Sequence, residues 1–190
     1  MGRLIVQEFV SLDGFAADAD GQFSFIDADA GPTVQLDRAT LDGLESVHAI
    51  VLGAQTYREF VEYWPTRASE GEPLAPRINA LPKFVFSRRL DAAPWPGPDN
   101  ATVVSGDAGD AIRSLKSEND GDLILWGSLT LLERLFDDDL VDVLRLVVVP
   151  VVLGAGRSVF PPTFAGVRLS LQRSAAYDGQ LVELEYALVH

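Results

Sequence analysis

Three junctions in the sequence place glycine, hydroxyl or guanidinium groups where an apolar run ends. They are Gly53-Ala54-Gln55-Thr56, Ser87-Arg88-Arg89 and Trp126-Gly127-Ser128-Leu129. The first and third lead into helical patterns, and the free N–H groups and positive dipole end of a helix N-terminus attract phosphate. In the second, a hydroxyl and two guanidinium groups suit a terminal phosphate monoester such as the 2′-phosphate of NADP. Together the junctions predict a site for a phosphate-bearing dinucleotide.

Each junction also has a purely structural explanation. The two glycine junctions can simply begin helices, and Arg88 and Arg89 can be solvated surface side chains. The formal net charge of -13 gives the few cations more weight, because an acidic protein must concentrate positive charge locally to hold an anionic ligand. The arginine pair therefore remains part of the predicted site.

Two acidic residues are considered as proton donors. Asp13 follows the first apolar run, and a positioned acid can supply the proton that accompanies a hydride. An Asp-Gly turn equally serves to bond its own backbone. Asp27 is the weaker alternative, since Asp27-Ala28-Asp29-Ala30 also fits a solvated helix start. The loop from Asp13 to Phe25 is the predicted lid over the reacting groups.

The sequence does not indicate a metal site. It contains no cysteine, which excludes disulfides, thiolate ligands and thiol catalysis. His48 opens an apolar run and His190 is the last residue, and neither has the neighbours that a metal site or catalytic triad needs. Asp137-Asp138-Asp139 fits a solvated turn better than a cation site.

The elements that must position these groups alternate along the chain. Apolar runs predict strands at Arg3 to Val10, His48 to Leu52, Lys83 to Phe86, Thr102 to Val104, Leu123 to Trp126, Val141 to Leu153, Val167 to Tyr177 and Leu181 to Leu188. Apolar residues at helical spacing predict helices over Val34 to Leu44, Tyr57 to Trp64, around Ile78, over Ala108 to Leu115 and over Leu129 to Phe136. Asp107 stands where it can cap a helix, and Asp178-Gly179 suits a hairpin turn.

This alternation predicts the α/β class in three layers. Parallel strands require crossovers, so helices should cover both faces of a mostly parallel, twisted sheet. The last two strands should close it as an antiparallel hairpin. Ligands of such sheets bind beyond the carboxyl ends of the strands, where the three junctions fall. No repeat or linker divides the chain, so residues 1–190 are expected to form a single domain.

Composition limits the partners and the compartment. The net charge argues against binding to DNA, RNA or anionic lipid, which attract clustered Lys and Arg. The longest apolar run, Leu144 to Leu153, is interrupted by Arg145 and Pro150 and is shorter than the ~20 residues of a membrane helix. Met1 to Val10 shows no secretion signal, so we expect a cytoplasmic protein.

The motifs, taken in order, resemble those of the dihydrofolate-reductase-like family. The closer resemblance is to its branch related to the C-terminal reductase domain of bacterial riboflavin biosynthesis. The similarity covers nearly the whole chain. It is carried by Ser11-Leu12-Asp13-Gly14, Gly53-x-x-Thr56-Tyr57, Val85-Phe86-Ser87-Arg88, Gly127-Ser128 before a leucine-rich helix, Leu140-Val141-Asp142, and Pro150-Val151-Val152-Leu153-Gly154-x-Gly156-Arg157.

The resemblance implies NADPH as hydride donor, a small-molecule substrate and a homodimer. It also assigns roles to individual positions. Gly53 and Thr56 would contact phosphate, Ser87 and Arg88, with Arg89, would hold the adenosine-side phosphate, the segment containing Gly127, Ser128, Leu129 and Leu132 would wrap the pyrophosphate, and Phe9 and Phe25 would lie near the nicotinamide and substrate.

The sequence departs from the family at two of these places. Relatives often carry a basic residue after the first glycine, where this chain has Ala54 and Gln55, so any preference for NADP depends on Arg88 or Arg89. Trp126 stands where relatives commonly have a smaller residue. The floor of the pocket is therefore expected to differ.

Two functions from different classes follow. The first is an NADPH-dependent reductase of a small heterocyclic or carbonyl-containing metabolite, with an activity like that of 5-amino-6-(5-phosphoribosylamino)uracil reductase or dihydrofolate reductase. The second is a non-catalytic nucleotide-binding or sensor protein on the same fold. Folate itself is the less favoured substrate, because no acid on the first helix stands in an evident setting for pterin recognition, although Asp37 is left open.

Overall fold

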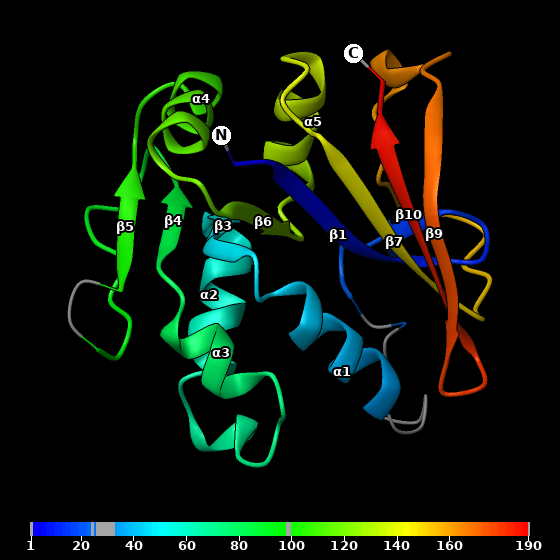
Figure 1. Ribbon diagram of the computed structural model, residues 1–190, viewed down its shortest axis with the longest axis horizontal. Coiled ribbons are helices and arrows are strands. Elements are labelled where there is room, and N and C mark those ends of the chain that lie inside the picture. Colours follow the sequence, from blue (N-terminus) through cyan, green and yellow to red (C-terminus); the bar gives the residue numbers. More distant parts are fainter. Residues whose placement is uncertain (1, 24, 26–32, 98–99, 190) are drawn as a thin grey trace.

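An eight-stranded sheet forms the centre of the computed structural model, which describes residues 2–23, 25, 33–97 and 100–189 (Figure 1). The strand order is β5-β4-β3-β6-β1-β7-β10-β9. The strands are β1 (Leu4–Ser11), β3 (Val47–Gly53), β4 (Lys83–Phe86), β5 (Ala101–Val104), β6 (Asp122–Trp126), β7 (Val143–Val149), β9 (Leu169–Tyr177) and β10 (Leu181–Leu188). From β5 to β7 all neighbours pair in parallel, and β10 pairs antiparallel with both β7 and β9. The expected mostly parallel sheet with a C-terminal antiparallel hairpin is confirmed.

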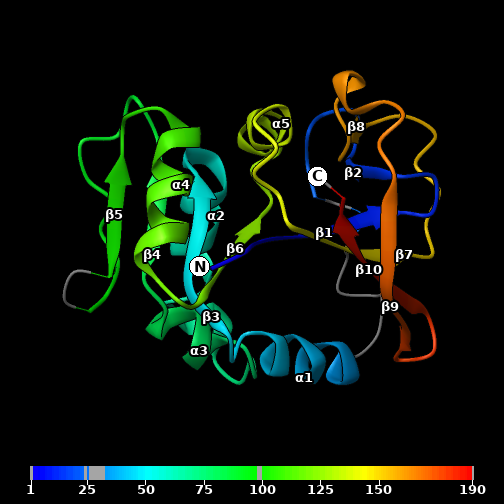
Figure 2. The ribbon, with the colours of Figure 1, turned by 45° about the horizontal axis from the view of Figure 1, so that its top comes forward.

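Helices cover the two faces of this sheet (Figure 2). They are α1 (Val34–Gly43), α2 (Ala54–Tyr63), α3 (Ala75–Ala80), α4 (Ala108–Glu118) and α5 (Leu129–Asp137), with short 3-10 turns η2 (Arg67–Ser69) and η3 (Pro162–Phe164). α4 and α5 pack on one face, whereas α1, α2 and α3 pack on the other. Each helix buries an apolar stripe, which is the main source of helix stability in a globular protein.

The central strands are apolar on both faces because helices lie on both sides of them. Leu4, Val6 and Val10 of β1 pack towards α4 and α5, and Ile5 packs towards α2 and α3. The side chains of β1 therefore alternate between two cores, as the two-residue period of a strand requires. This alternation decides which side chains of β1 can reach which helix.

Local signals in the sequence account for several boundaries. The Asp107 side chain accepts a hydrogen bond from the Asp110 amide at 3.0 Å and caps α4, as predicted. Asp178 and Gly179 adopt positive φ angles of 53° and 75° in the hairpin turn between β9 and β10. The run from Val141 to Leu153 forms a strand only over Val143–Val149, because Pro150 offers no N–H to continue it.

One small pairing was not predicted. β2 (Phe15–Ala17) and β8 (Arg157–Ser158) form a separate two-stranded antiparallel sheet. A Cβ atom on Gly156 would lie 2.2 Å from the Ala17 carbonyl oxygen, so a glycine is required for this approach. The pairing fixes the loop after β1 against the segment after β7.

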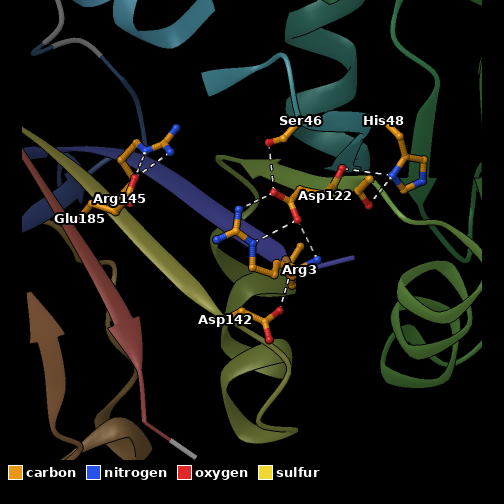
Figure 3. Close-up of polar contacts among 9 residues, drawn as sticks. Arg3, Ser46, His48, Asp122, Asp142, Arg145 and Glu185 are labelled. Carbon is orange, nitrogen blue, oxygen red and sulfur yellow. Dashed lines mark hydrogen bonds and ion pairs between the residues drawn. The ribbon is translucent and has the colours of Figure 1, made fainter. Parts of the chain in front are cut away.

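The amino ends of the strands carry a network of paired charges (Figure 3). Arg3 donates to both carboxylate oxygens of Asp122, with the shorter contact at 2.6 Å, and Ser46 donates to the same carboxylate at 3.1 Å. Lys116 pairs with Asp142 at 2.5 Å, and Arg145 pairs with Glu185 at 2.7 Å. These contacts join strands that are distant in the sequence.

Within the described residues, no helix combines the length and apolar character needed to cross a membrane. The same residues contain no cluster of three or more His, Cys, Asp or Glu side chains that could hold a metal ion.

Candidate functional site

A cavity of about 1560 Å³ opens at the carboxyl ends of the parallel strands. It is large compared with an ordinary small-molecule pocket of ~300–1,000 Å³, so its size suits a dinucleotide together with a second ligand. Its wall includes residues from the ends of five strands, from α1 and α2, and from the segment Asp20 to Phe23. All three predicted junctions therefore face one cavity.

Thr56 and Ser128 join two of these junctions directly. The Ser128 amide donates to the Thr56 hydroxyl oxygen at 3.0 Å, and the Ser128 hydroxyl donates to the same oxygen at 3.1 Å. The Gly53 amide donates to the Ser128 hydroxyl oxygen at 2.7 Å. The starts of α2 and α5 are thus held side by side. The Gly53 amide and the Ser128 hydroxyl are used in this contact, which differs from the expectation that both face a phosphate.

Gly127 makes this contact sterically possible. Its φ of 56° lies in the left-handed region, where a side chain is strained. An added Cβ would lie 3.0 Å from the Thr56 hydroxyl oxygen and 3.1 Å from its methyl carbon. Ser128 also has a positive φ of 61°, so the chain turns sharply from β6 into α5.

The first turns of α2 and α5 remain uncapped by side chains. The two helices have ten and nine residues, and both begin at the wall of the cavity. A helix N-terminus without a capping side chain leaves N–H groups for a ligand. Two such termini, held together by Thr56 and Ser128, form a suitable cradle for a diphosphate.

The two arginines of the second junction have different positions relative to the cavity. Ser87 and Arg88 line the cavity, whereas Arg89 does not. The Ser87 hydroxyl oxygen accepts from the amides of Arg89 and Leu90, both at 3.1 Å, and so shapes the turn after β4. Arg88 is exposed and can reach a ligand from the rim. Arg88 is therefore the better placed of the two to meet a phosphate.

Glu8 contributes a buried acid to the same wall. Its side chain is 1% exposed, and neither carboxyl oxygen has a hydrogen-bonding partner among the described residues. Burial raises the pKa of Glu8 well above its usual range, and the nearby Gly127 backbone amide acts in the opposite direction. Burial therefore favours the uncharged form of this carboxyl.

At the other end of the cavity, α1 supplies an acid. Asp37 lines the cavity and accepts a hydrogen bond from the Thr33 hydroxyl at 3.1 Å. Burial raises the pKa of Asp37, the Thr33 bond lowers it, and the charges of Glu72 and Asp178 raise it further. The sequence left this residue open, and the structure places it where a heterocycle could meet it.

The aromatic residues near this end differ from the prediction in one respect. Phe9 lines the cavity as expected. Phe25 is 8% exposed and packs in the core with Leu36 and Val147, whereas its neighbour Phe23 lines the cavity. The Phe23 and Phe25 ring centroids lie 5.6 Å apart, so Phe25 supports the ring that faces the ligand space.

Asp13 lies outside the wall of the cavity and has a different set of contacts. It accepts hydrogen bonds from the Ser11 hydroxyl at 2.7 Å and from the amides of Leu153 and Gly154 at 3.1 and 2.8 Å. The Ser11 bond, followed by the Leu153 bond, lowers the pKa of Asp13 to about 2. A carboxylate with this pKa holds no proton to deliver at neutral pH. These contacts favour the backbone-bonding alternative for Asp13 over proton donation.

The remaining predicted positions are divided between cavity and core. Leu129 lines the cavity, but Leu132 lies fully buried on the core-facing side of α5. Asp27 and His190 lie outside the described residues. His48 bonds through its Nδ1 atom to the carbonyl oxygens of Gly121 and Asp122, at the opposite end of the sheet.

Comparisons with known proteins agree with this architecture. The model of the family described as "RibD C-terminal domain" matches residues 3–182. The uncharacterized protein YyaP of Bacillus subtilis is 24% identical over 188 residues, covering 97% of this chain and 94% of that protein.

Two solved structures show the same fold. A protein from Shewanella sp. PV-4, assigned to riboflavin biosynthesis, has a TM-score of 0.79 at 21% identity, with 99% of both chains covered. Dihydrofolate reductase from Enterococcus faecalis, solved with NADP(H), has a TM-score of 0.63 at 13% identity and covers 100% of this chain and 98% of its own. The expected dihydrofolate-reductase-like fold is confirmed.

Proposed function

The chain belongs to the RibD C-terminal domain family, and from this premise we propose that it is an NADPH-dependent reductase of a small heterocyclic or carbonyl-containing metabolite. The cavity that joins the three strand-to-loop junctions is the observation that carries the proposal. Thr56, Ser87 and Ser128 all line it. Had these residues faced different sides of the molecule, no dinucleotide could have contacted all of them.

The dinucleotide is proposed to lie across the starts of α2 and α5. The uncapped amides of both helices would bind the pyrophosphate, and Arg88 would meet the adenosine-side phosphate. This arrangement points the nicotinamide towards β1, where Phe9 and Glu8 line the wall. The residues fit the cofactor because Arg88 and the uncapped helix amides can meet its phosphates, and Phe9 offers an apolar surface to the nicotinamide.

When bound, NADPH would supply a hydride, which with one proton reduces a C=O or C=N bond of the acceptor and leaves NADP⁺. The protein's task is to hold donor and acceptor ~3–3.5 Å apart and to exclude water. Phe9 and Phe23 give the cavity apolar walls at this end. The loop from Asp13 to Phe25 remains the proposed lid, and its residues Asp20 to Phe23 line the cavity.

The substrate is proposed to enter beside α1. Asp37 and Thr40 line that part of the cavity and offer a carboxyl and a hydroxyl to a heterocycle. The cytoplasm is the proposed compartment, and nucleic acids and membranes are not proposed as partners. Substrates like 5-amino-6-(5-phosphoribosylamino)uracil or dihydrofolate fit this chemistry.

The other function is a nucleotide sensor without turnover. Ala54 and Gln55 favour the sensor, because they stand at the start of α2 where relatives often carry a basic residue. Fluorescence titration with NADPH and NADH tests binding, and oxidation of NADPH over a panel of pterin and ribityl-pyrimidine acceptors tests turnover. Oxidation with one acceptor establishes the reductase. Tight binding without oxidation across the panel would favour the sensor, and absence of binding would remove both proposals.

A homodimer is proposed through one face of the C-terminal hairpin. Leu171 and Val182 are 55% and 40% exposed, and Leu146 and Val148 of β7 are half-buried beside Val182 and its neighbours. A twofold partner would bury this apolar face. Light scattering after size-exclusion chromatography measures the state, and a monomer at micromolar concentration would contradict the proposal.

A further inference from the structure

Glu8 is an acid in the middle of the central strand, and the proposed hydride chemistry does not explain it. The side chains of β1 alternate, and Glu8 lies between Val6 and Val10, which pack towards α5. It is only 1% exposed. An apolar residue would be expected at this position, because both neighbours on the same face belong to the core.

The other buried acids among the described residues have partners. Glu183 is 2% exposed and pairs with Arg173, and Asp122 is 6% exposed and pairs with Arg3. Within the part of the chain that the structure describes, neither carboxyl oxygen of Glu8 has a hydrogen bond of ordinary geometry, although the Gly127 amide lies near. A buried polar group without a hydrogen bond destabilises the fold, so its presence in the cavity wall calls for an explanation.

No cation compensates Glu8 among the described residues. The charged side chains on the elements packed against β1 have other partners. These are Asp122 with Arg3 on β6, Arg145 with Glu185 on β7, and, on α5, Glu133 with Arg157, Arg134 with Asp138 and Asp137 with Thr163. Burial raises the pKa of Glu8 and so favours the protonated carboxyl, which presents one O–H donor and one C=O acceptor.

The sheet opens at Glu8. β6 pairs with β1 only from Leu4 to Gln7 and ends at Trp126, whereas β7 continues to pair with β1 as far as Ser11. Beyond Gln7, Gly127 turns away into α5, so the cavity reaches the central strand. The unpaired carboxyl thus lies in the cavity wall beside the proposed cradle.

We propose that Glu8 is a ligand-binding residue whose protonated carboxyl pairs with an amide edge, a C=O beside an N–H, on the molecule bound in this cavity. The donor and acceptor of a carboxylic acid lie side by side in one plane and match the acceptor and donor of such an edge. This inference rests on the proposed function, in which two groups carry such an edge. They are the carboxamide of the nicotinamide and the lactam of a heterocyclic substrate.

Two substitutions and one control separate this pairing from a packing role. Glu8→Gln keeps a donor and an acceptor in the same places, and Glu8→Leu keeps the volume but removes both. Glu183→Gln alters a buried acid outside the cavity and serves as the matched control. Fluorescence or calorimetric titration is done with NADPH, with 2′-phospho-ADP-ribose, which lacks the nicotinamide, and with folic acid, which carries a lactam edge.

Glu8→Leu is expected to weaken NADPH binding about tenfold, as the loss of two hydrogen bonds implies. Binding of 2′-phospho-ADP-ribose should not change, and Glu8→Gln should bind NADPH as the wild type does. If NADPH binding is unaffected and folic acid binding falls instead, the substrate is the source of the amide edge. The Glu183→Gln protein should match the wild type with every probe.

Three results would overturn the pairing. They are unchanged binding of all probes by Glu8→Leu, an equal loss for 2′-phospho-ADP-ribose, and a loss in Glu8→Gln as large as in Glu8→Leu. Each leaves the reductase proposal intact as long as the wild type binds NADPH. A wild type that binds neither NADPH nor folic acid would overturn the proposed function and the pairing with it.

A pH series provides a second measurement that needs no apolar variant. As pH rises, ionisation of Glu8 removes the O–H donor, so the wild type should lose affinity for its amide-bearing ligand. Glu8→Gln cannot ionise and should show a flatter profile over the same range. Identical profiles for the two proteins would overturn the pairing even if Glu8→Leu fails to fold.

Discussion

The two ends of the parallel sheet are built in opposite ways. At the amino ends of the strands, Arg3 is paired with Asp122 (Figure 3). Lys116 is likewise paired with Asp142. At the carboxyl ends, α2 and α5 begin without capping side chains and the Glu8 carboxyl has no partner among the described residues. One end satisfies its polar groups within the protein, and the other leaves them for a ligand.

This difference teaches where stability and binding should be sensitive to mutation. Pairs such as Arg3 with Asp122 join β1 to β6 and need no ligand to be complete. On the proposed function, the uncapped helix amides beside Gly127 and the Glu8 carboxyl would gain partners from a ligand in the cavity. Substitutions at the amino ends should therefore lower stability alone, and substitutions at the carboxyl ends should lower affinity.

The largest expected effect is at Gly127, where both properties change. Gly127→Ala places a methyl group 3.0 Å from the Thr56 hydroxyl oxygen at a φ of 56°. The left-handed backbone costs about 1–2 kcal/mol of stability. Displacement of Thr56 should also lower NADPH affinity by about tenfold or more, since such sites tolerate little misplacement.

Gly14→Ala is the matched control for this substitution. Gly14 also has a positive φ, of 88°, but an added Cβ meets nothing within 4 Å. It should show the loss of stability in thermal unfolding without the loss of NADPH affinity. Equal affinities for the two variants would show that the close contact at Gly127 does not shape the cradle.

The next largest effect tests the amino end. Asp122→Ala removes the acceptor of Arg3 and Ser46 and should lower the free energy of unfolding by about 2 kcal/mol. NADPH affinity should stay at the wild-type value. Chemical denaturation and titration measure the two quantities, and a folded variant with weakened binding would contradict the separation of the two ends.

The same pair predicts a pH dependence. Burial acts to raise the pKa of Asp122, but the hydrogen bonds and charge of Arg3 outweigh it and hold the pKa below the ordinary 3.8. A carboxyl whose pKa is lower in the folded protein than in the unfolded chain stabilises the fold at pH values above its unfolded pKa. This stabilisation is lost as the pH falls through the folded pKa. The difference between Asp122→Ala and the wild type should therefore shrink in acid, below about pH 4.

Arg88 provides a test at the carboxyl ends of the strands, with a smaller expected effect. Arg88→Ala should weaken NADPH binding about tenfold, because the proposed charged contact to the 2′-phosphate would be lost, and should affect NADH less. Arg89→Ala is the control, since Arg89 does not line the cavity. Calorimetric titration with both cofactors measures the ratio. An equal loss of NADPH and NADH affinity would remove Arg88 as the basis of cofactor choice.

The smallest expected effect is at Lys83, which lies at the amino end of β4 and is an exception to the charge pairing found there. Lys83 is 1% exposed, donates to the Asn79 carbonyl oxygen at 3.0 Å and lies 4.1 Å from the centre of the Trp95 ring. Desolvation lowers the pKa of Lys83 from 10.5 to about 7. Between these values the unfolded chain holds more protons than the folded one, so this residue makes stability rise with pH.

Lys83→Met should remove that rise and increase Tm near pH 7 by a few degrees at most, on the order of 2–4 °C per kcal/mol. Lys116→Met is the comparison, because Lys116 is paired with Asp142 and its loss should destabilise at both pH 7 and pH 9. Thermal unfolding at the two pH values gives the result. A wild-type slope that persists in Lys83→Met would show that another group titrates.

Most of the fold could be predicted from the sequence because its signals are local. The last strand was predicted at Leu181 to Leu188 and lies there, since an Asp-Gly turn and an alternating pattern both define it. The pairing of β2 with β8 could not be predicted, because Phe15–Ala17 and Arg157–Ser158 are too short to show a period. Only the tertiary approach at Gly156 determines it.

The candidate site was predicted where it depends on backbone and missed where it depends on packing. Gly53, Thr56 and Gly127 were found from the junctions that contain them. Glu8 was missed because it stands inside an apolar run that correctly indicates a strand. An acid within such a run was the available signal. Asp13 was considered as the proton donor because it is an acid after the first strand, and only the contacts with Leu153 and Gly154 show what it bonds.

The early end of β6 has a consequence for how this cavity could evolve. The strand stops at Trp126, and β1 runs on for four more residues with β7 alone beside it. A few added residues of strand would fill the gap with backbone and exclude any ligand, although every contacting side chain could stay the same. The hollow is thus encoded by strand length, so insertions and deletions before Gly127 would alter specificity more abruptly than substitutions in the wall.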